Sequence, residues 1–211
     1  MRINLFRLLL ESKSIQFNNS SKNKIEFSGK QFPLISSGSD RRSVIYNQGT
    51  GSGATIYICY KRLSGNSNYS IEFGFDGDNM IYNLGTTNPY ENIWHHYVFT
   101  FNNSTKLMRL YIDGILINTD TRTGGTTASG DIYIGKSGSE YMEGLLHNLA
   151  LYNEVRSVKQ IQNDMRLNEL ELNTTNLMLY LPMNIDNNYI TDIVSNLGKS
   201  TSQGTIQNIN Y

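Results

Sequence analysis

Cysteine is nearly absent from this 211-residue chain, and so is any excess of charge of one sign. The one cysteine, Cys59, excludes an intramolecular disulfide framework. That fits a reducing compartment, but many surface and virion proteins also lack disulfides, so the compartment stays open. Lysine plus arginine number 18, and aspartate plus glutamate also number 18. This balance disfavours a nucleic-acid partner, whose phosphates need neutralising, and equally a polybasic contact with a membrane.

A long hydrophobic run is also missing. The run Leu8–Leu10 is too short to span a bilayer, so we expect no membrane insertion. Arg7 and the lack of a small-residue cleavage site argue against a signal peptide. We expect residues 1–13 to form a separate apolar segment that covers either its own chain or a neighbour. A homo-oligomer or larger assembly through this segment is therefore one expectation.

Short segments rich in β-branched and aromatic residues fill the middle of the chain. Residues 94–152 contain WHHYVFTF, LMRLYIDG, DIYIGKSG and MEGLLHNLALYN, each closed by Gly, Asn or Asp. Such segments are typical of antiparallel strands joined by tight turns. In residues 69–75 we expect Tyr69, Ile71, Phe73 and Phe75 on a buried face, and Ser70, Glu72 and Gly74 on a wet one. Further expectations are a hairpin over 14–27, strands over 43–46 and 54–60, turns over 49–53, 64–68 and 76–79, and loops over 86–92 and 119–130.

One helix is expected after residue 152. Ser157 and Gln160 have the spacing of a capping box. Val158, Ile161 and Met165 follow at helical spacing.

The order Trp-His-His, Leu-Tyr-Ile-Asp-Gly, Ile-Gly and Gly144–Leu149 resembles the LamG-like jelly-roll domains of the concanavalin A-like superfamily. The resemblance implies an all-β, two-sheet antiparallel jelly-roll sandwich with one short helix, as a single domain over residues 14–211. The pattern LMLYLPMN at 177–184, with Gly204-Thr205-Ile206 after it, usually opens such domains, but here it ends the sequence. Residues 177–211 are then either strands that close a permuted domain, which we favour, or the start of a truncated repeat.

Catalytic residues are not expected. Glucanases of the superfamily carry Glu-x-Asp-x-x-Glu on one strand, which places three carboxylates on one face, and no such run occurs here. A Ser-His-Asp site is equally unsupported, and His95 and His96 match positions of ordinary packed or hydrogen-bonded strand residues.

A single calcium ion is the one cofactor that the sequence leaves open. Many LamG-like domains bind Ca²⁺ through loop carboxylates and carbonyls. Here His147 stands where the family's strand usually has Asp, which weakens that expectation. Asp76, Asp78 and Asn79 could supply ligands, although DGDN is also ordinary turn chemistry.

A glycan site would combine exposed aromatic rings with polar loop side chains. The candidates are Tyr69, Tyr90, Asn92 and Tyr141, whereas Trp94 is expected to be a core or strand-end anchor. We therefore expect a non-catalytic recognition or adhesion module that binds glycan or a protein surface. The alternative is a structural or assembly protein, such as a capsid, appendage or surface-layer component. Either role favours the cell surface, the extracellular space or a virion over a metabolic role in the cytoplasm.

Overall fold

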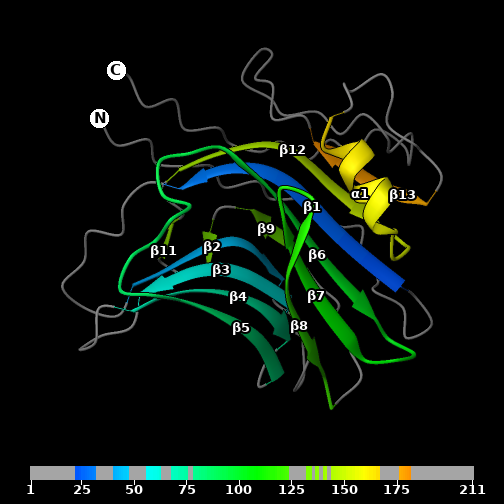
Figure 1. Cartoon of the computed structure of the whole chain (residues 1–211), viewed down its shortest axis with the longest axis horizontal. Coiled ribbons are helices and arrows are strands. Elements are labelled where there is room, and N and C mark those ends of the chain that lie inside the picture. The colour runs from blue at the N-terminus through cyan, green and yellow to red at the C-terminus, as the bar shows by residue number, and fades with distance from the viewer. Residues whose placement is uncertain are drawn as a thin grey trace.

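The computed structural model has two antiparallel sheets that face each other, a separate two-stranded sheet of β10 and β11, and one short helix on the outside (Figure 1). This confirms the predicted all-β sandwich. The first sheet has six strands in the order β13-β12-β1-β6-β7-β8, and the second has five in the order β5-β4-β3-β2-β9. The structure describes residues 22–31, 40–47, 56–62, 68–75, 78–123, 132–134, 136–137, 140–141, 144–166 and 176–181.

The strand bounds follow the predicted segments closely for the central strands. They are β1 Lys22–Gln31, β2 Asp40–Asn47, β3 Ile56–Arg62, β4 Tyr69–Phe75, β5 Asp78–Gly85, β6 His95–Asn102, β7 Leu107–Ile112, β8 Ile115–Thr121, β9 Ile132–Ile134, β10 Lys136–Ser137, β11 Glu140–Tyr141, β12 Gly144–Tyr152 and β13 Leu177–Leu181. Strand β5 was not expected from the sequence, and it begins inside the predicted turn at 76–79. The expected first half of the 14–27 hairpin lies outside the described residues, as do the turns at 49–53 and 64–67.

The core lies between the two sheets and is rich in aromatic rings. Phe73 of β4 packs on Phe99 of β6 with ring centroids 5.2 Å apart, and Phe75 packs on Phe101 at 4.8 Å. All four side chains are buried, as strand alternation predicts for this face. Phenylalanine pairs of this kind add to the apolar area removed from water.

The other face of β4 was expected to be wet, and that expectation is wrong. Ser70 is 2% exposed and Glu72 is 3% exposed. A buried carboxylate needs a partner, because leaving it without one is costly. Lys61 on the neighbouring strand β3 supplies it, with its Nζ 3.1 Å from Glu72 Oε1. The five-stranded sheet therefore buries side chains on both of its faces at β3 and β4.

Helix α1 (Val158–Asp164) covers part of the outer face of the six-stranded sheet (Figure 1). Its capping box forms as predicted, because the Ser157 side chain accepts from Gln160 N and the Gln160 side chain accepts from Ser157 N. Ile161 is fully buried in a cluster with Val98 of β6 and Tyr111 of β7. Met165 follows the helix as its C-cap.

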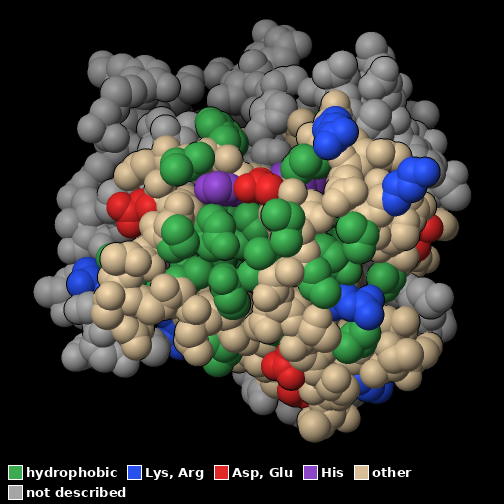
Figure 2. Space-filling view, viewed as in Figure 1, with side chains coloured by type: hydrophobic (Ala, Val, Ile, Leu, Met, Phe, Trp, Pro, Cys, Tyr) green, Lys and Arg blue, Asp and Glu red, His purple; other side chains and the backbone are tan. Residues whose placement is uncertain are grey.

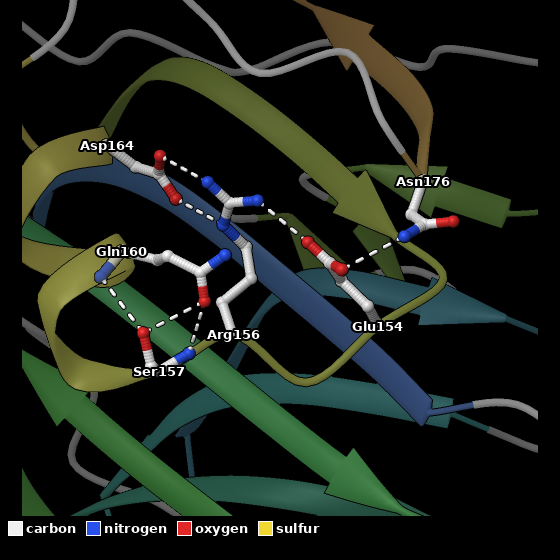
Figure 3. Close-up of polar contacts among 6 residues, drawn as sticks. All are labelled: Glu154, Arg156, Ser157, Gln160, Asp164 and Asn176. Atoms are coloured by element: carbon white, nitrogen blue, oxygen red, sulfur yellow. Dashed lines mark hydrogen bonds and ion pairs between the residues drawn. The ribbon is translucent and has the colours of Figure 1, made fainter.

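A buried ion-pair network fastens the helix to the chain that enters it (Figure 3). Arg156 donates to both carboxylate oxygens of Asp164 at 2.7 Å and to Glu154 Oε1 at 2.7 Å. Glu154 also accepts from Asn176 Nδ2 at 2.9 Å, which links the network to the start of β13. The guanidinium lies over the ring of Tyr152, 4.9 Å from its centroid.

Strand β13 pairs with β12 at the edge of the six-stranded sheet. Leu179 joins the main core and Tyr180 lies on the outer face, as alternation predicts. Leu177 was expected on the face of Leu179, but it joins the outer cluster of Tyr180, and Met178 packs against the core instead. The cause is an irregularity in the pairing between Leu151 and Tyr152, which shifts the register by one residue.

Strand β8 forms the opposite edge of the six-stranded sheet. The expectation of a loop over 119–130 is wrong at its start, because β8 continues to Thr121. Arg122 N donates to Lys106 O of the neighbouring hairpin arm, so the backbone N–H groups of Thr119 and Thr121 point away from β7. Each of them donates instead to the side chain of the preceding residue. The distances are 2.9 Å from Thr119 N to Asn118 Oδ1 and 2.8 Å from Thr121 N to Asp120 Oδ1.

In the part of the chain that the structure describes, no helix is both long and apolar enough to cross a bilayer.

Candidate glycan-binding edge

A two-residue turn between β7 and β8 carries an exposed carboxylate, that of Asp113. Asp113 and Gly114 have φ values of 51° and 75°, as a type I′ hairpin requires. A Cβ on Gly114 would lie 2.8 Å from Gln162 Cγ of helix α1, so glycine is needed for space as well. Gln162 Nε2 donates to Gly114 O at 3.3 Å, which ties the turn to the helix.

Two consecutive histidines of β6 hold the Asp113 carboxylate. His95 Nδ1 lies 2.7 Å from Asp113 Oδ2, and His96 N donates to Asp113 Oδ1 at 2.9 Å. Because a carboxylate only accepts hydrogen bonds, Nδ1 of His95 carries the proton. The Asp113 side chain is still 46% exposed, so its remaining lone pairs face solvent. The expectation that His95 and His96 are hydrogen-bonded strand residues agrees with this geometry.

The loop between β5 and β6 places an aromatic ring against this pair. Tyr90 N donates to Asn88 Oδ1 at 3.0 Å, a local turn bond that fixes the backbone before Tyr90. The Tyr90 ring meets the His95 ring edge-on, at 5.1 Å between centroids and 88° between planes. Burial raises the pKa of Tyr90 to about 12, with further contributions from Tyr82 and the charge of Asp113.

Apolar side chains gather beside the His95–Asp113 pair, on the face shown in Figure 2. Tyr82, Leu84, Tyr90 and Ile117 are partly buried against the core at this edge of the sandwich, between β5 and β8. Ile93, Trp94, Ile115 and Leu116 are exposed. We call Tyr82, Leu84, Tyr90 and Ile117, with Asn92, His95 and Asp113, the β5–β8 edge site. Trp94 is 47% exposed, so it is not a core residue, and it lies directly before β6, which is the strand-end position that the sequence also allowed.

The structure brings together two of the four predicted ligand-binding residues. Tyr90 and Asn92 belong to the same loop, where Asn92 is exposed with a φ of 62°. Tyr69 opens β4, and its ring carries the guanidinium of Arg62 at 5.6 Å from the centroid. Tyr141 lies in β11, and its side chain is outside the described residues. The β5–β8 edge site therefore includes Tyr90 and Asn92.

Of the three residues considered for calcium, Asp78 is engaged in a different contact. Asp78 Oδ2 accepts from Thr123 N at 2.8 Å, from Thr123 Oγ1 at 3.0 Å and from Arg122 Nε at 3.3 Å. Asn79 Oδ1 is buried and accepts no hydrogen bond. Asp76 lies outside the described residues, and no group of three or more His, Cys, Asp or Glu forms a metal site within the described ranges. Of His147, the structure describes only the backbone, which pairs with Ser28. Calcium binding stays a prediction.

Sequence reasoning did not assign Asp113 or His95 to a site. Asp113 reads as a turn residue in the Asp-Gly pair, and its contact with His95 spans 18 positions of sequence. The signal that could have found it is the antiparallel pairing of β6 with β7, which sets Tyr97 opposite Ile112 and so brings the start of β6 to this turn.

A laminin-G family described as "Concanavalin A-like lectin/glucanases superfamily" matches residues 14–162. The chain belongs to this superfamily. No curated protein sequence matches it closely enough to count as a relative.

Solved structures of the concanavalin A-like type share the fold at low sequence identity. A Bacteroides ovatus protein named for carbohydrate binding superposes with a TM-score of 0.57 at 15% identity, covering 92% of this chain and 56% of that one. The heptameric SAP-like pentraxin of Limulus polyphemus gives 0.52 at 12% identity, covering 75% and 72%. The Ruminococcus gnavus IT-sialidase CBM40, bound to α2,3-sialyllactose, gives 0.50 at 12% identity, covering 79% and 96%. At these identities the likeness concerns the fold.

Proposed function

We propose that this concanavalin A-like chain is a non-catalytic recognition module that binds carbohydrate at the β5–β8 edge site. The supporting observation is the half-exposed Asp113 carboxylate, which two donors hold in place beside the Tyr90 ring. Sugars present C–H faces that pack on aromatic rings and hydroxyls that donate directionally, so a ring beside a fixed acceptor suits them. Two of these fold relatives, one named for carbohydrate binding and one bound to sialyllactose, are consistent with this role.

Each part of the site has a separate task. The apolar surface of Tyr90 would pack on the sugar, and Asp113 would accept from its hydroxyls. His95 orients Asp113 and does not need to touch the ligand, so it is a positioning residue. An extracellular or surface location suits such a module.

A glycan array followed by titration calorimetry tests the proposal. Asp113→Asn keeps one carbonyl acceptor and tolerates the left-handed φ, yet it removes the charge-assisted hydrogen bond, worth about 1.5–3 kcal/mol, so affinity should fall roughly 10-fold or more. Tyr90→Ala should abolish binding, and Tyr90→Phe should retain it. Tyr69→Ala is the matched control, because Tyr69 was an equal candidate in the sequence but lies on β4 beneath Arg62. Melting temperatures show that each variant is folded.

Loss of binding in Tyr69→Ala, with Tyr90→Ala unchanged, would move the site to β4 and refute the present assignment. Hydrolysis of a bound glycan that scales with protein concentration would refute the non-catalytic role.

The alternative role as a structural or assembly component remains a prediction from the sequence. The observation that favours it is the exposed apolar side chains on two of the edge strands, Ile81 of β5 and Ile115 and Leu116 of β8. Analytical ultracentrifugation at tens of micromolar distinguishes the roles, since a monomer at that concentration would end the assembly alternative.

A further inference from the structure

We infer that the β5–β8 edge site takes uncharged glycans and rejects glycans whose bound sugar carries a carboxylate. This inference rests on the proposed function and adds the chemical class of the ligand. It follows from the sign of the charges around the Tyr90 ring.

Two carboxylates lie close to that ring, one through its contact with His95 and one as the next residue in the chain. Asp113 is half exposed, and its Oδ2 lies 2.7 Å from Nδ1 of His95, whose ring meets the Tyr90 ring edge-on at 5.1 Å between centroids. Glu91 follows Tyr90 directly in the loop and is partly exposed. A sugar lying on Tyr90 would therefore lie close to two negative charges.

The two described cations at this end of the five-stranded sheet, Lys61 and Arg62, are engaged elsewhere. Lys61 pairs with the buried Glu72 on the outer face of the sheet. Arg62 lies over Tyr69, whose backbone pairs with Gly85 of β5 and with Arg62 of β3. Arg62 is thus two strands from β5, about 10 Å at the usual strand spacing, where salt screens much of its influence.

The histidine does not supply a cation for the ligand either. Its Nδ1–H is used by Asp113, and its Nε2 is buried and makes no hydrogen bond. An incoming carboxylate would also lack the hydroxyl donors that Asp113 needs, because an ionised carboxylate only accepts. Repulsion between the carboxylates and the lack of a hydroxyl donor therefore both weaken the binding of an acidic sugar.

Matched pairs of glycans test the inference. Each pair sets a neutral glycan beside its acidic counterpart: lactose and 3′-sialyllactose, N-acetyllactosamine and its sialylated form, xylo-oligosaccharide and its glucuronic-acid-substituted form, galactan and polygalacturonate. The neutral member should bind, and the acidic member should bind at least roughly 3-fold more weakly, as expected for one like charge about 6 Å away in water. The experiment uses the full chain at low and high salt.

Glu91→Gln should reduce the ratio of the neutral to the acidic member's affinity within each pair by roughly 3-fold at low salt. The control is Asp120→Asn, an equal change of charge near the far end of β8 that keeps a side-chain acceptor for Thr121 N. Asp120→Asn should leave the ratio of the two affinities within each pair unchanged.

The outcomes distinguish a failure of this inference from a failure of the proposed function. Acidic glycans that bind as tightly as neutral ones, through a Tyr90-dependent site, would overturn the inference and leave the proposed function standing. A ratio of affinities that Glu91→Gln and Asp120→Asn change equally would also overturn it, because the selectivity would then not come from this site. Absence of binding to every pair would overturn the proposed function itself.

Discussion

Arg156 holds three acceptor oxygens while almost fully buried. Burial alone would lower the pKa of its guanidinium, but hydrogen bonds to Asp164 and Glu154 outweigh burial and raise that pKa. The side chain is therefore charged at every pH at which the protein is folded. Its partner Asp164 is 7% exposed and has little access to water.

Replacing Arg156 by Met should lower the free energy of unfolding by about 3–5 kcal/mol, because Asp164 would remain buried without its partner. The double variant Arg156→Met with Asp164→Leu should recover most of this loss, since both charges are removed together. Urea unfolding followed by circular dichroism measures both values. A single variant as stable as the parent would show that the network contributes little.

Three tyrosines near the β5–β8 edge share a consequence for stability at high pH. Burial is the largest cause of the raised pKa of Tyr60, Tyr90 and Tyr97, and the Tyr60 and Tyr97 rings pack edge-to-face with centroids 5.8 Å apart. A tyrosine whose pKa is higher in the folded state than in the unfolded state binds its proton more tightly when folded. The stability it contributes is complete below pH 10 and is lost as the pH rises above that value.

We therefore expect the free energy of unfolding to fall steadily above pH 10, with the contribution of Tyr90 lost between pH 10 and about 12. Tyr90→Phe should reduce the slope over that interval. Thermal melts at pH 8, 10, 11 and 12 measure this loss of stability, and absorbance at the tyrosinate band follows the ionisation of the tyrosines. A parent protein equally stable at pH 8 and 11 would contradict the argument.

At the scale of elements, the sequence predicts best where local and tertiary signals agree. Helix α1 was predicted because Ser157 and Gln160 cap it and Ile161 falls on its buried face. Strand β6 was predicted because Tyr97, Phe99 and Phe101 alternate with smaller residues. For the edge strands, the sequence pattern that indicates a strand was weaker. Strand β8 shows no buried side chain, so its polar second half reads as a loop, and β5 starts with the turn-like residues Asp78 and Asn79.

The expectation that one face of β4 is exposed to solvent was wrong for a different reason. Alternation separates two faces correctly, but it does not say what covers the second one. Ser70 and Glu72 are polar by type, and only the structure shows that they are buried and that Lys61 neutralises Glu72.

For the whole molecule, the sequence predicted the two-sheet fold, since turn-bounded strands and the family resemblance both indicate it. The candidate site could be predicted only in part. Tyr90 and Asn92 were found as aromatic and polar loop residues, whereas His95 and Asp113 meet because β6 and β7 are paired in one register. Nothing in composition fixes that register. The domain division at residues 13 and 14, and the place of residues 182–211, remain predictions.

Strand β13 offers a test at this scale. A chain ending at Leu172 lacks the buried side chains of Leu177, Leu179 and Tyr180, each worth roughly 1.5–3 kcal/mol. That sum rivals the net stability of a domain, so this chain should be largely unfolded, whereas a chain ending at Leu181 keeps β13 and should be markedly more stable. Circular dichroism melts compare the two. Equal melting temperatures would show that β13 is dispensable.

The outer side of β8 has a consequence for behaviour in crowded solution. A sheet edge with free N–H groups is a template on which strands of other molecules can add, which is how many β-proteins begin to form fibrils. Asn118 and Asp120 occupy the N–H groups of Thr119 and Thr121, so a strand arriving at this half of β8 finds those donors already bonded. Asn118→Ala with Asp120→Ala should therefore convert a well-behaved protein into one that increases thioflavin-T fluorescence on prolonged incubation, while its initial melting temperature changes little. The two short polar side chains would then act as protection against the protein's own copies.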